Sequence, residues 1–343
     1  TAVGQRALEN VTTGDKNTGL GWNAGGALTT GDFNTFVGQR AGDAITTGDK
    51  NVAVGSEALS SGPSGENCTA VGYQALFANS TASNNTALGA TSLSGNTTGT
   101  ENTALGAFAS ASSTTANNCT SVGYAALNAL TTGSSNTAVG REAGKTNVSA
   151  SHNTLIGAES FKTTTGGGNT GLGSQSGENC SSGELNTAVG YNAGLALTTG
   201  DNNLLLGYQA GTSSSPAEID DDDNRIVLGN NSITHAYIKV DWTVGSDERD
   251  KTDINDITTG LNFVNQLKPK SFWFTKERGS SEKHGDKKYG FLAQDILALE
   301  GSDPVVINNS NENSLKYQGS HLIPILVNAI KELSTKVTAL EAG

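Results

Sequence analysis

Thirteen glycines recur along the first two thirds of the chain at an almost constant interval. Eleven of the twelve gaps between them are seventeen residues long, and the remaining gap is sixteen. A period held this tightly predicts that each repeat forms one coil of a stacked solenoid, because a single coil cannot bury its own apolar face. We call these residues the marker glycines: Gly4, Gly21, Gly38, Gly55, Gly72, Gly89, Gly106, Gly123, Gly140, Gly157, Gly173, Gly190 and Gly207.

Each column of the repeat, counted from the marker glycine, has its own chemistry. Asn stands four residues before the glycine in ten of twelve coils, and stacking would place these amides about 4.8 Å apart, as in a side-chain ladder. Val, Leu or Ile directly precedes every marker glycine, and we expect it to point inward. Ala or Ser three residues after the glycine fits a narrow interior. Gly or Ala ten residues after it follows Thr pairs, which predicts a corner where Gly supplies a positive φ.

The sequence therefore predicts a mainly β protein whose residues 1–211 form a rod of β-solenoid or β-roll coils. Forty-four Gly, no Met and few aromatic residues are typical of thin β structure. Thirteen coils at about 4.8 Å each give a rod of roughly 60 Å. Because a thin core of Ala and Val buries little area per residue, we expect the rod to be stabilised by oligomerisation, with apolar columns of several chains meeting along an axis.

The net charge of −12 is concentrated in the rod. Residues 1–245 hold nine Lys and Arg against nineteen Asp and Glu. Nucleic-acid binding by charge needs a basic surface, so we expect no nucleic-acid partner. A recurring acidic turn position is interpreted as a solvated face, with cation binding along the ladder as the alternative; it holds Asp15, Asp32, Asp49, Glu66, Glu184 and Asp201. The run 220–223 is interpreted as a solvated linker, because it lacks the Gly and final Glu of a calcium loop.

Three cysteines and four scattered histidines show no metal-ligand spacing, and we expect neither a metal nor a cofactor. Cys68 and Cys119 both occupy the Asn column three coils apart, and a separation of roughly 14 Å is too long for a disulfide within one chain. Buried thiols are the leading interpretation, and contact between equivalent cysteines of neighbouring chains is the alternative. No segment has the length and hydropathy to cross a membrane, and no signal peptide is visible. The chain begins in mid-repeat without Met, which suggests a fragment.

The pattern changes after Gly211. Residues 212–245 are interpreted as a linker with two β-type runs, at 225–229 and 236–244. Residues 246–343 have a globular composition and end in a predicted helix over about 320–341. Its apolar residues are spaced 3-4-3-4-3, which is an a/d seam, and the pattern of Ile or Val at a with Leu at d favours two strands in isolated coiled coils. The seam consists of Ile323, Leu326, Ile330, Leu333, Val337 and Leu340.

Several motifs follow one another in residues 246–343: Ser246-Asp-Glu-Arg-Asp-Lys251, Leu267-Lys-Pro269, Phe272-Trp-Phe274, and Gly290-Phe-Leu-Ala-Gln-Asp295. In this order they resemble the intramolecular chaperone auto-processing domain of bacteriophage tail fibres and tailspikes, which also occurs in endosialidases. The resemblance implies a small α+β domain that trimerises, templates the fibre ahead of it, and cuts itself off through a Ser-Lys dyad. The repeats also resemble trimeric phage fibres and the β-roll heads of trimeric autotransporter adhesins.

On this resemblance, Ser246 would be the nucleophile and Lys251 its base. A neutral amine is required, so burial must lower the pKa of the lysine, and Asp250 and Asp253 should point away from it. The resemblance places the cut at Ser246–Asp247. Attack on the preceding carbonyl passes through a five-membered ring, so both sides of Ser246 remain open.

The function that we expect is host-surface attachment by a viral tail fibre or spike. The partners would be two copies of the chain, a glycan or protein receptor on the host, and other tail proteins, without membrane insertion. We expect the chain to be made in the host cytoplasm and to reside in the virion. A bacterial trimeric surface adhesin is the main alternative. A glycan-degrading tailspike is a weaker one, because its carboxylates should form a singular cluster 5–9 Å apart rather than a repeated turn column.

Overall fold

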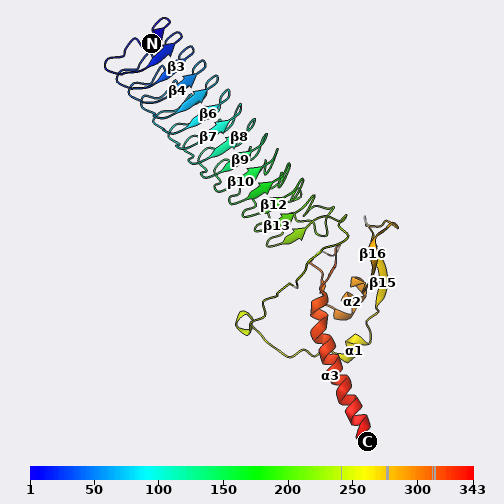
Figure 1. The fold of residues 1–343 in the computed structure, drawn as a ribbon. Helices are drawn as coiled ribbons and strands as arrows, with labels where there is room; N and C mark the ends of the chain where they lie inside the picture. Colours follow the sequence, from blue (N-terminus) through cyan, green and yellow to red (C-terminus); the bar gives the residue numbers. More distant parts are fainter. Residues whose placement is uncertain (241, 276–277, 311, 313) are drawn as a thin grey trace. The chain divides into compact units, whose positions relative to one another are not determined.

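The computed structural model describes residues 1–240, 242–275, 278–310, 312 and 314–343, which form two compact units, Thr1–Asn231 and Ser232–Gly343. The first unit is the predicted solenoid (Figure 1). Its fourteen short strands lie side by side in chain order in one parallel sheet. The strands are β1 Ala2–Val3, β2 Thr18–Leu20, β3 Thr35–Val37, β4 Val52–Val54, β5 Thr69–Val71, β6 Thr86–Leu88, β7 Thr103–Leu105, β8 Thr120–Val122, β9 Thr137–Val139, β10 Thr154–Ile156, β11 Thr170–Leu172, β12 Thr187–Val189, β13 Leu204–Leu206 and β14 Ile226–Leu228.

The strands face the other way from the sequence-based expectation. In β2–β14 the middle residue is buried, whereas the Val, Leu or Ile before the marker glycine is half-buried or exposed. Leu88, for example, is 48% exposed, and Ala87 next to it is fully buried. The prediction that this aliphatic column points inward is therefore wrong. Side chains alternate along a strand, so a small inward residue leaves its larger neighbour on the outer face.

The interior is filled by two facing columns of complementary size. One is the middle residue of each strand, and the other lies four residues after the marker glycine. Where one column holds Phe36, the other holds Gly25, whose added Cβ would lie 2.7 Å from the Phe36 ring. Phe161 faces Gly171 in the same way. The Ala and Ser column three residues after the glycine is also buried, as predicted.

Two glycine columns are explained by the close approach of neighbouring coils. The marker glycines have φ between 109° and 140°, and a Cβ on Gly21 would lie 2.7 Å from the carbonyl carbon of Gly38. The glycines ten residues later, such as Gly14, do not have the positive φ that we predicted. They are small because a Cβ on Gly14 would lie 2.5 Å from the Gly31 carbonyl oxygen.

Polar ladders join the coils. The Asn34 backbone N–H donates to Asn17 Oδ1 at 2.9 Å, and Asn34 Nδ2 donates to the Gly48 carbonyl oxygen at 2.9 Å, so each amide bonds in both directions. Cys68 substitutes for Asn in this ladder: its N–H donates to Asn51 Oδ1 at 3.0 Å, and its sulfur lies 3.4 Å from the Ala82 carbonyl oxygen. Burial raises the pKa of the Cys68 thiol. All three cysteines are buried and unpaired by disulfides.

The acidic turn column is more than a solvated face, because its side chains accept backbone hydrogen bonds from the preceding coil. The Asp15 N–H donates to Asp32 Oδ1 at 2.6 Å, and the Asp32 N–H donates to Asp49 Oδ1 at 2.8 Å. Ser134 and Ser151 repeat the same contact at 2.9 Å with a hydroxyl acceptor. The column thus selects a short side chain with an oxygen acceptor, and charge is secondary.

Two coils depart from the seventeen-residue period without breaking the sheet. In the shorter coil, Thr154 pairs with Thr170, so register is kept across the missing residue. At the other end, β14 pairs with β13 through Leu204 and Ile226. Residues 212–223, which we interpreted as part of a linker, are instead an enlarged loop of this last coil, with Ile219 buried.

The second unit is a small α+β arrangement. A hairpin of β15 (Lys270–Thr275) and β16 (Lys283–Gly290) accompanies the short pair β17 (Ile307–Asn308) and β18 (Lys316–Tyr317). The helices are α1 (Leu261–Val264), α2 (Ala293–Glu300) and α3 (Leu322–Glu341), with single 3-10 turns at Glu248–Asp250 and Gly319–His321. A small core consists of Ile296, Val306, Ile307, Leu322 and Ile325. The long terminal helix was predicted to within two residues.

The segment that precedes the 3-10 turn Glu248–Asp250 is extended and exposed. The β-type run predicted at 236–244 forms no strand in its described residues, 236–240 and 242–244. Tyr237 is 91% exposed, Trp242 73% and Val244 82%. A single chain therefore leaves these large apolar side chains in water.

Candidate functional site

The two predicted catalytic residues lie together at the start of the second unit. Lys251 Nζ is 2.8 Å from Ser246 Oγ and 2.9 Å from the Ser246 carbonyl oxygen. The 3-10 turn Glu248–Asp250 produces this approach. Asp247 caps the turn by accepting the Arg249 N–H at 2.9 Å, and the Lys251 N–H donates to the Glu248 carbonyl oxygen at 3.1 Å.

The Asp247 carboxylate of this segment is paired with Arg249 rather than with Lys251. Asp247 forms a two-point ion pair with Arg249, at 3.0 and 2.7 Å, and this hydrogen bonding lowers the pKa of Asp247. In the described part of the chain, no salt bridge joins Lys251 to Asp250 or Asp253. That these two acids point away from the lysine stays a prediction.

The burial that the proposed chemistry requires is not supplied within one chain. Ser246 and Lys251 are both exposed, as is every other residue from 246 to 259. Only a protein surface placed over the pair could remove that solvent. The geometry of a Ser-Lys pair is thus present, and its catalytic role stays a prediction.

Comparison with known families identifies this region. Residues 246–302 match the model of a family described as chaperone of endosialidase. The second unit therefore contains a chaperone-of-endosialidase domain, and a β-solenoid rod precedes it in the chain. The match begins at Ser246, the first residue of the pair described above. Searches among curated proteins and among solved structures find no match to the chain.

Helix α3 presents two different faces. Leu322, Ile325 and Ala329 are buried against the rest of the unit. The predicted seam lies on a separate, neighbouring face and is exposed, between 38% at Leu326 and 81% at Leu340. Six apolar residues in water along one face are an interface without a partner in the single chain. That these helices form a coiled coil stays a prediction.

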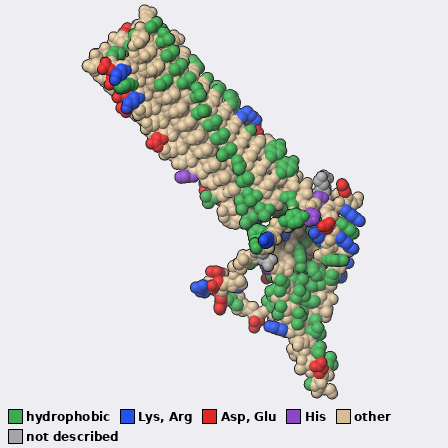
Figure 2. All heavy atoms as spheres, viewed as in Figure 1, with side chains coloured by type: hydrophobic (Ala, Val, Ile, Leu, Met, Phe, Trp, Pro, Cys, Tyr) green, Lys and Arg blue, Asp and Glu red, His purple; other side chains and the backbone are tan. Residues whose placement is uncertain are grey.

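The outer face of the rod is a second apolar surface, which the sequence analysis missed because it placed this column inside. We call it the outer stripe: Val3, Leu20, Val37, Val54, Val71, Leu88, Leu105, Val122, Val139, Ile156, Leu172, Val189, Leu206 and Leu228. Figure 2 shows apolar side chains in rows along the rod. Exposed aromatic residues follow some of the marker glycines, and Tyr191 and Tyr208 stack with their centroids 5.8 Å apart.

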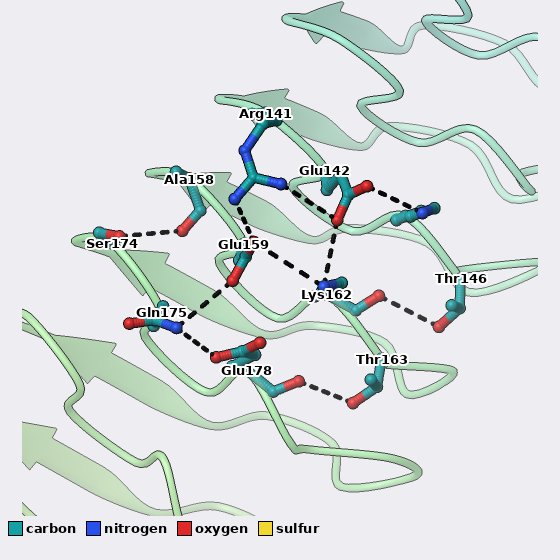
Figure 3. Close-up of polar contacts among 11 residues, drawn as sticks. Arg141, Glu142, Thr146, Ala158, Glu159, Lys162, Thr163, Ser174, Gln175 and Glu178 are labelled. Atoms are coloured by element: carbon teal, nitrogen blue, oxygen red, sulfur yellow. Dashed lines mark hydrogen bonds and ion pairs between the residues drawn. The ribbon is translucent and has the colours of Figure 1, made fainter.

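One charged network on the rod breaks the repetition (Figure 3). Glu142 accepts from Lys145 at 2.9 Å and lies 3.1 Å from Lys162, and Arg141 pairs with Glu159. Hydrogen bonding from Lys145 lowers the pKa of Glu142, and that from Arg141 lowers the pKa of Glu159. These two carboxylates are already neutralised by cations, which fits a role in joining coils better than acid-base chemistry.

The last acid of this network behaves differently. Burial raises the pKa of Glu178, and Gln175 Nε2 donates to Glu178 at 2.9 Å and to Glu159 at 3.3 Å.

Among the described residues, no group of three or more His, Cys, Asp or Glu is arranged to hold a metal ion. None of the helices in the described ranges is both long and apolar enough to cross a membrane.

Proposed function

We propose that this chain is a segment of a trimeric viral tail fibre or spike, folded by a C-terminal chaperone that releases itself by cleavage at Ser246. The observation that carries the proposal is the coincidence of three features. A chaperone-of-endosialidase match starts at Ser246, a lysine amine lies 2.8 Å from that hydroxyl, and a β-solenoid precedes both.

The unpaired surfaces support trimerisation. The α3 seam, the outer stripe and the exposed run around Trp242 are all apolar and all lack cover in one chain. Three copies related by an axis would bury each surface against its own equivalents. In the run before the turn, Ile238, Val240 and Val244 alternate in a β pattern, so strand pairing between chains is the natural way to satisfy that backbone.

The contact of Lys251 with the Ser246 carbonyl oxygen supports cleavage of the Ser246–Asp247 bond. In this route the Ser246 hydroxyl, hydrogen-bonded to the Lys251 amine, would take a proton from a water molecule that adds to this carbonyl carbon, leaving a Ser246 carboxylate and a free Asp247 amine. The alternative is attack by Ser246 Oγ on the Gly245 carbonyl, followed by hydrolysis of the resulting ester, which leaves Ser246 as the new N-terminus.

The test is expression of the full chain followed by intact-mass measurement. Cleavage yields a fragment of 97 residues if it starts at Asp247 (343 − 246) or 98 if it starts at Ser246 (343 − 245). Ser246→Ala and Lys251→Ala should stay whole yet trimeric, because they remove chemistry rather than packing. Lys268→Ala, an exposed lysine of the same unit, is the matched control and should be cut normally. Undiminished cleavage in both dyad variants would show that the dyad is misassigned.

Attachment to a host surface is the remaining part of the proposal. A rod of stacked coils displays long rows of identical side chains, and it places whatever binds the host at a distance from the chaperone end. The released fibre would reside in the virion with other tail proteins. Binding of the purified trimer to intact host cells, and its loss after removal of surface glycans or proteins, would distinguish the two receptor classes.

A further inference from the structure

Two polar side chains on α3 hold the backbone that follows the Ser-Lys turn. Asn328 Nδ2 donates to the Thr259 carbonyl oxygen at 3.1 Å and to the Ile257 carbonyl oxygen at 3.4 Å. Glu332 Oε2 accepts the Leu261 N–H at 3.0 Å, and Asn328 Nδ2 lies 3.4 Å from Glu332 Oε1. We call this group the α3 clamp.

Gly260 allows the clamp to close. A Cβ at this position would overlap the Glu332 carboxylate and would lie 3.0 Å from Asn328 Nδ2. The carboxylate would have to move away, and its bond to the Leu261 N–H would be lost. The clamp therefore depends on a glycine for space rather than for an unusual φ, which is −153°.

The α3 clamp attaches residues 246–256, the segment that carries Ser246 and Lys251, to the folded part of the second unit. In the described structure, the hydrogen bonds of residues 246–256 all stay within that segment, as in Ser246–Lys251, Asp247–Arg249 and Asn255–Asp253. The contacts of Asn328 and Glu332 with residues 257–261 follow directly. Asn328 and Glu332 lie off the apolar seam of α3, so they can hold this segment while the seam engages other copies.

We propose that Asn328 and Glu332 are positioning residues for self-cleavage, an inference that rests on the function proposed above. Ile257 is six positions after Lys251, so the tether keeps the Ser-Lys turn within about 20 Å of α3. When three α3 helices associate, the clamp delivers each turn to a fixed place beside them. There a neighbouring chain can cover the exposed pair and remove its solvent. Without the clamp the turn samples a far larger volume.

The experiment compares the full chain with Asn328→Asp, Glu332→Ala and Gly260→Ala. Asn328→Asp keeps the shape of the side chain but turns a donor into an acceptor facing two carbonyl oxygens. Each variant should remain trimeric by sedimentation and should cleave at least about tenfold more slowly, since small misplacements of reacting groups cost this much or more. In Gly260→Ala the rate should fall equally at every pH, because neither the dyad nor any other titratable side chain has been changed.

Two controls separate positioning from folding. Glu332→Gln keeps an oxygen that can accept the Leu261 N–H, and it should cleave within about threefold of the wild type, because a neutral acceptor loses only part of the bond. Lys331→Ala changes an exposed neighbour on the same helix and should have no effect. Hydrogen exchange at the Leu261 amide should accelerate in Glu332→Ala and stay slow in Glu332→Gln.

The outcomes distinguish this inference from the function on which it rests. A wild-type chain that stays whole overturns both. Wild-type cleavage together with an undiminished rate in Asn328→Asp and Gly260→Ala overturns the clamp alone. Loss of the trimer in these variants also overturns it, because the residues would then serve assembly rather than positioning.

Discussion

The rod and the C-terminal unit differ in how completely a single chain buries their apolar side chains. In the rod, interior columns are fully buried and each coil bonds to the next through backbone, Asn and turn-column contacts. In the C-terminal unit, five buried residues form the core, while the α3 seam and the Ser-Lys turn lie in water. The contrast indicates that the interior of the rod is encoded coil by coil, whereas the exposed apolar face of the C-terminal unit supports the trimer proposed above.

The largest expected effect concerns the exposed α3 seam of the C-terminal unit. Leu326→Asp should abolish trimerisation of the full chain, because an unpaired charge buried in the seam costs about 3–5 kcal/mol per chain. Sedimentation should show a monomer. Lys331→Asp lies on the same helix outside the seam and should leave the trimer intact. If Leu326→Asp remained trimeric, the seam would not be the assembly surface.

The next largest effect concerns the stability of the rod. Asn34→Ala removes an acceptor for the Asn51 N–H and a donor to the Gly48 carbonyl oxygen. Leaving such buried groups unpaired should cost about 1–3 kcal/mol in the free energy of unfolding of the rod. Asn34→Cys should cost less, because in the same column the Cys68 sulfur lies 3.4 Å from the Ala82 carbonyl oxygen, in the place of the amide donor. Denaturant unfolding of the cleaved rod measures both; equal losses would contradict the substitution of thiol for amide.

The smallest effect concerns pH. The pKa values of Glu142 and Glu159 are lowered in the folded rod, so their stabilisation is present above the ordinary value of 4.5 and is lost as pH falls below it. The raised pKa of Glu178 acts in the opposite direction: its contribution is present below the ordinary value and is lost as pH rises through the folded one. These pairs are partly solvated, so the net loss between pH 5 and 3 should be about 1 kcal/mol or less.

Thermal unfolding at the two pH values measures this change. Glu142→Gln should reduce the difference, and Glu101→Gln, at an exposed turn, should leave it unchanged. A difference that was the same in Glu142→Gln as in the wild type would show that the network does not link rod stability to pH.

The solenoid, its period and its small Ala column could be predicted from sequence because they depend on identity between coils. Which side chains of each strand point into the rod could not be predicted from the sequence. A repeat shows which residues stack on one another, but hydrophobicity alone placed Val37 and Leu88 inside, and volume decides otherwise. The match between Phe36 and Gly25 is visible only when positions eleven residues apart are known to face each other.

The candidate site was predicted more completely in its residues than in its environment. Ser246 and Lys251 are brought together by the turn that the motif forms. Its exposure, and the attachment of the following segment to Asn328, depend on contacts between residues about seventy positions apart, which no local pattern contains. The same limit explains why the run at 236–244 was assigned to a strand that one chain does not form.

The stacking of the marker glycines has a consequence for how such a molecule can change over generations. Each glycine touches its equivalent in the next coil, and the strands pair in the same register throughout. A duplication or deletion of seventeen residues therefore restores the strand register and the glycine contact at the junction, whereas a change of any other size must be absorbed in a loop. Length becomes a trait that recombination can vary in whole steps of about 4.8 Å, with the cross-section and the outer stripe inherited unchanged.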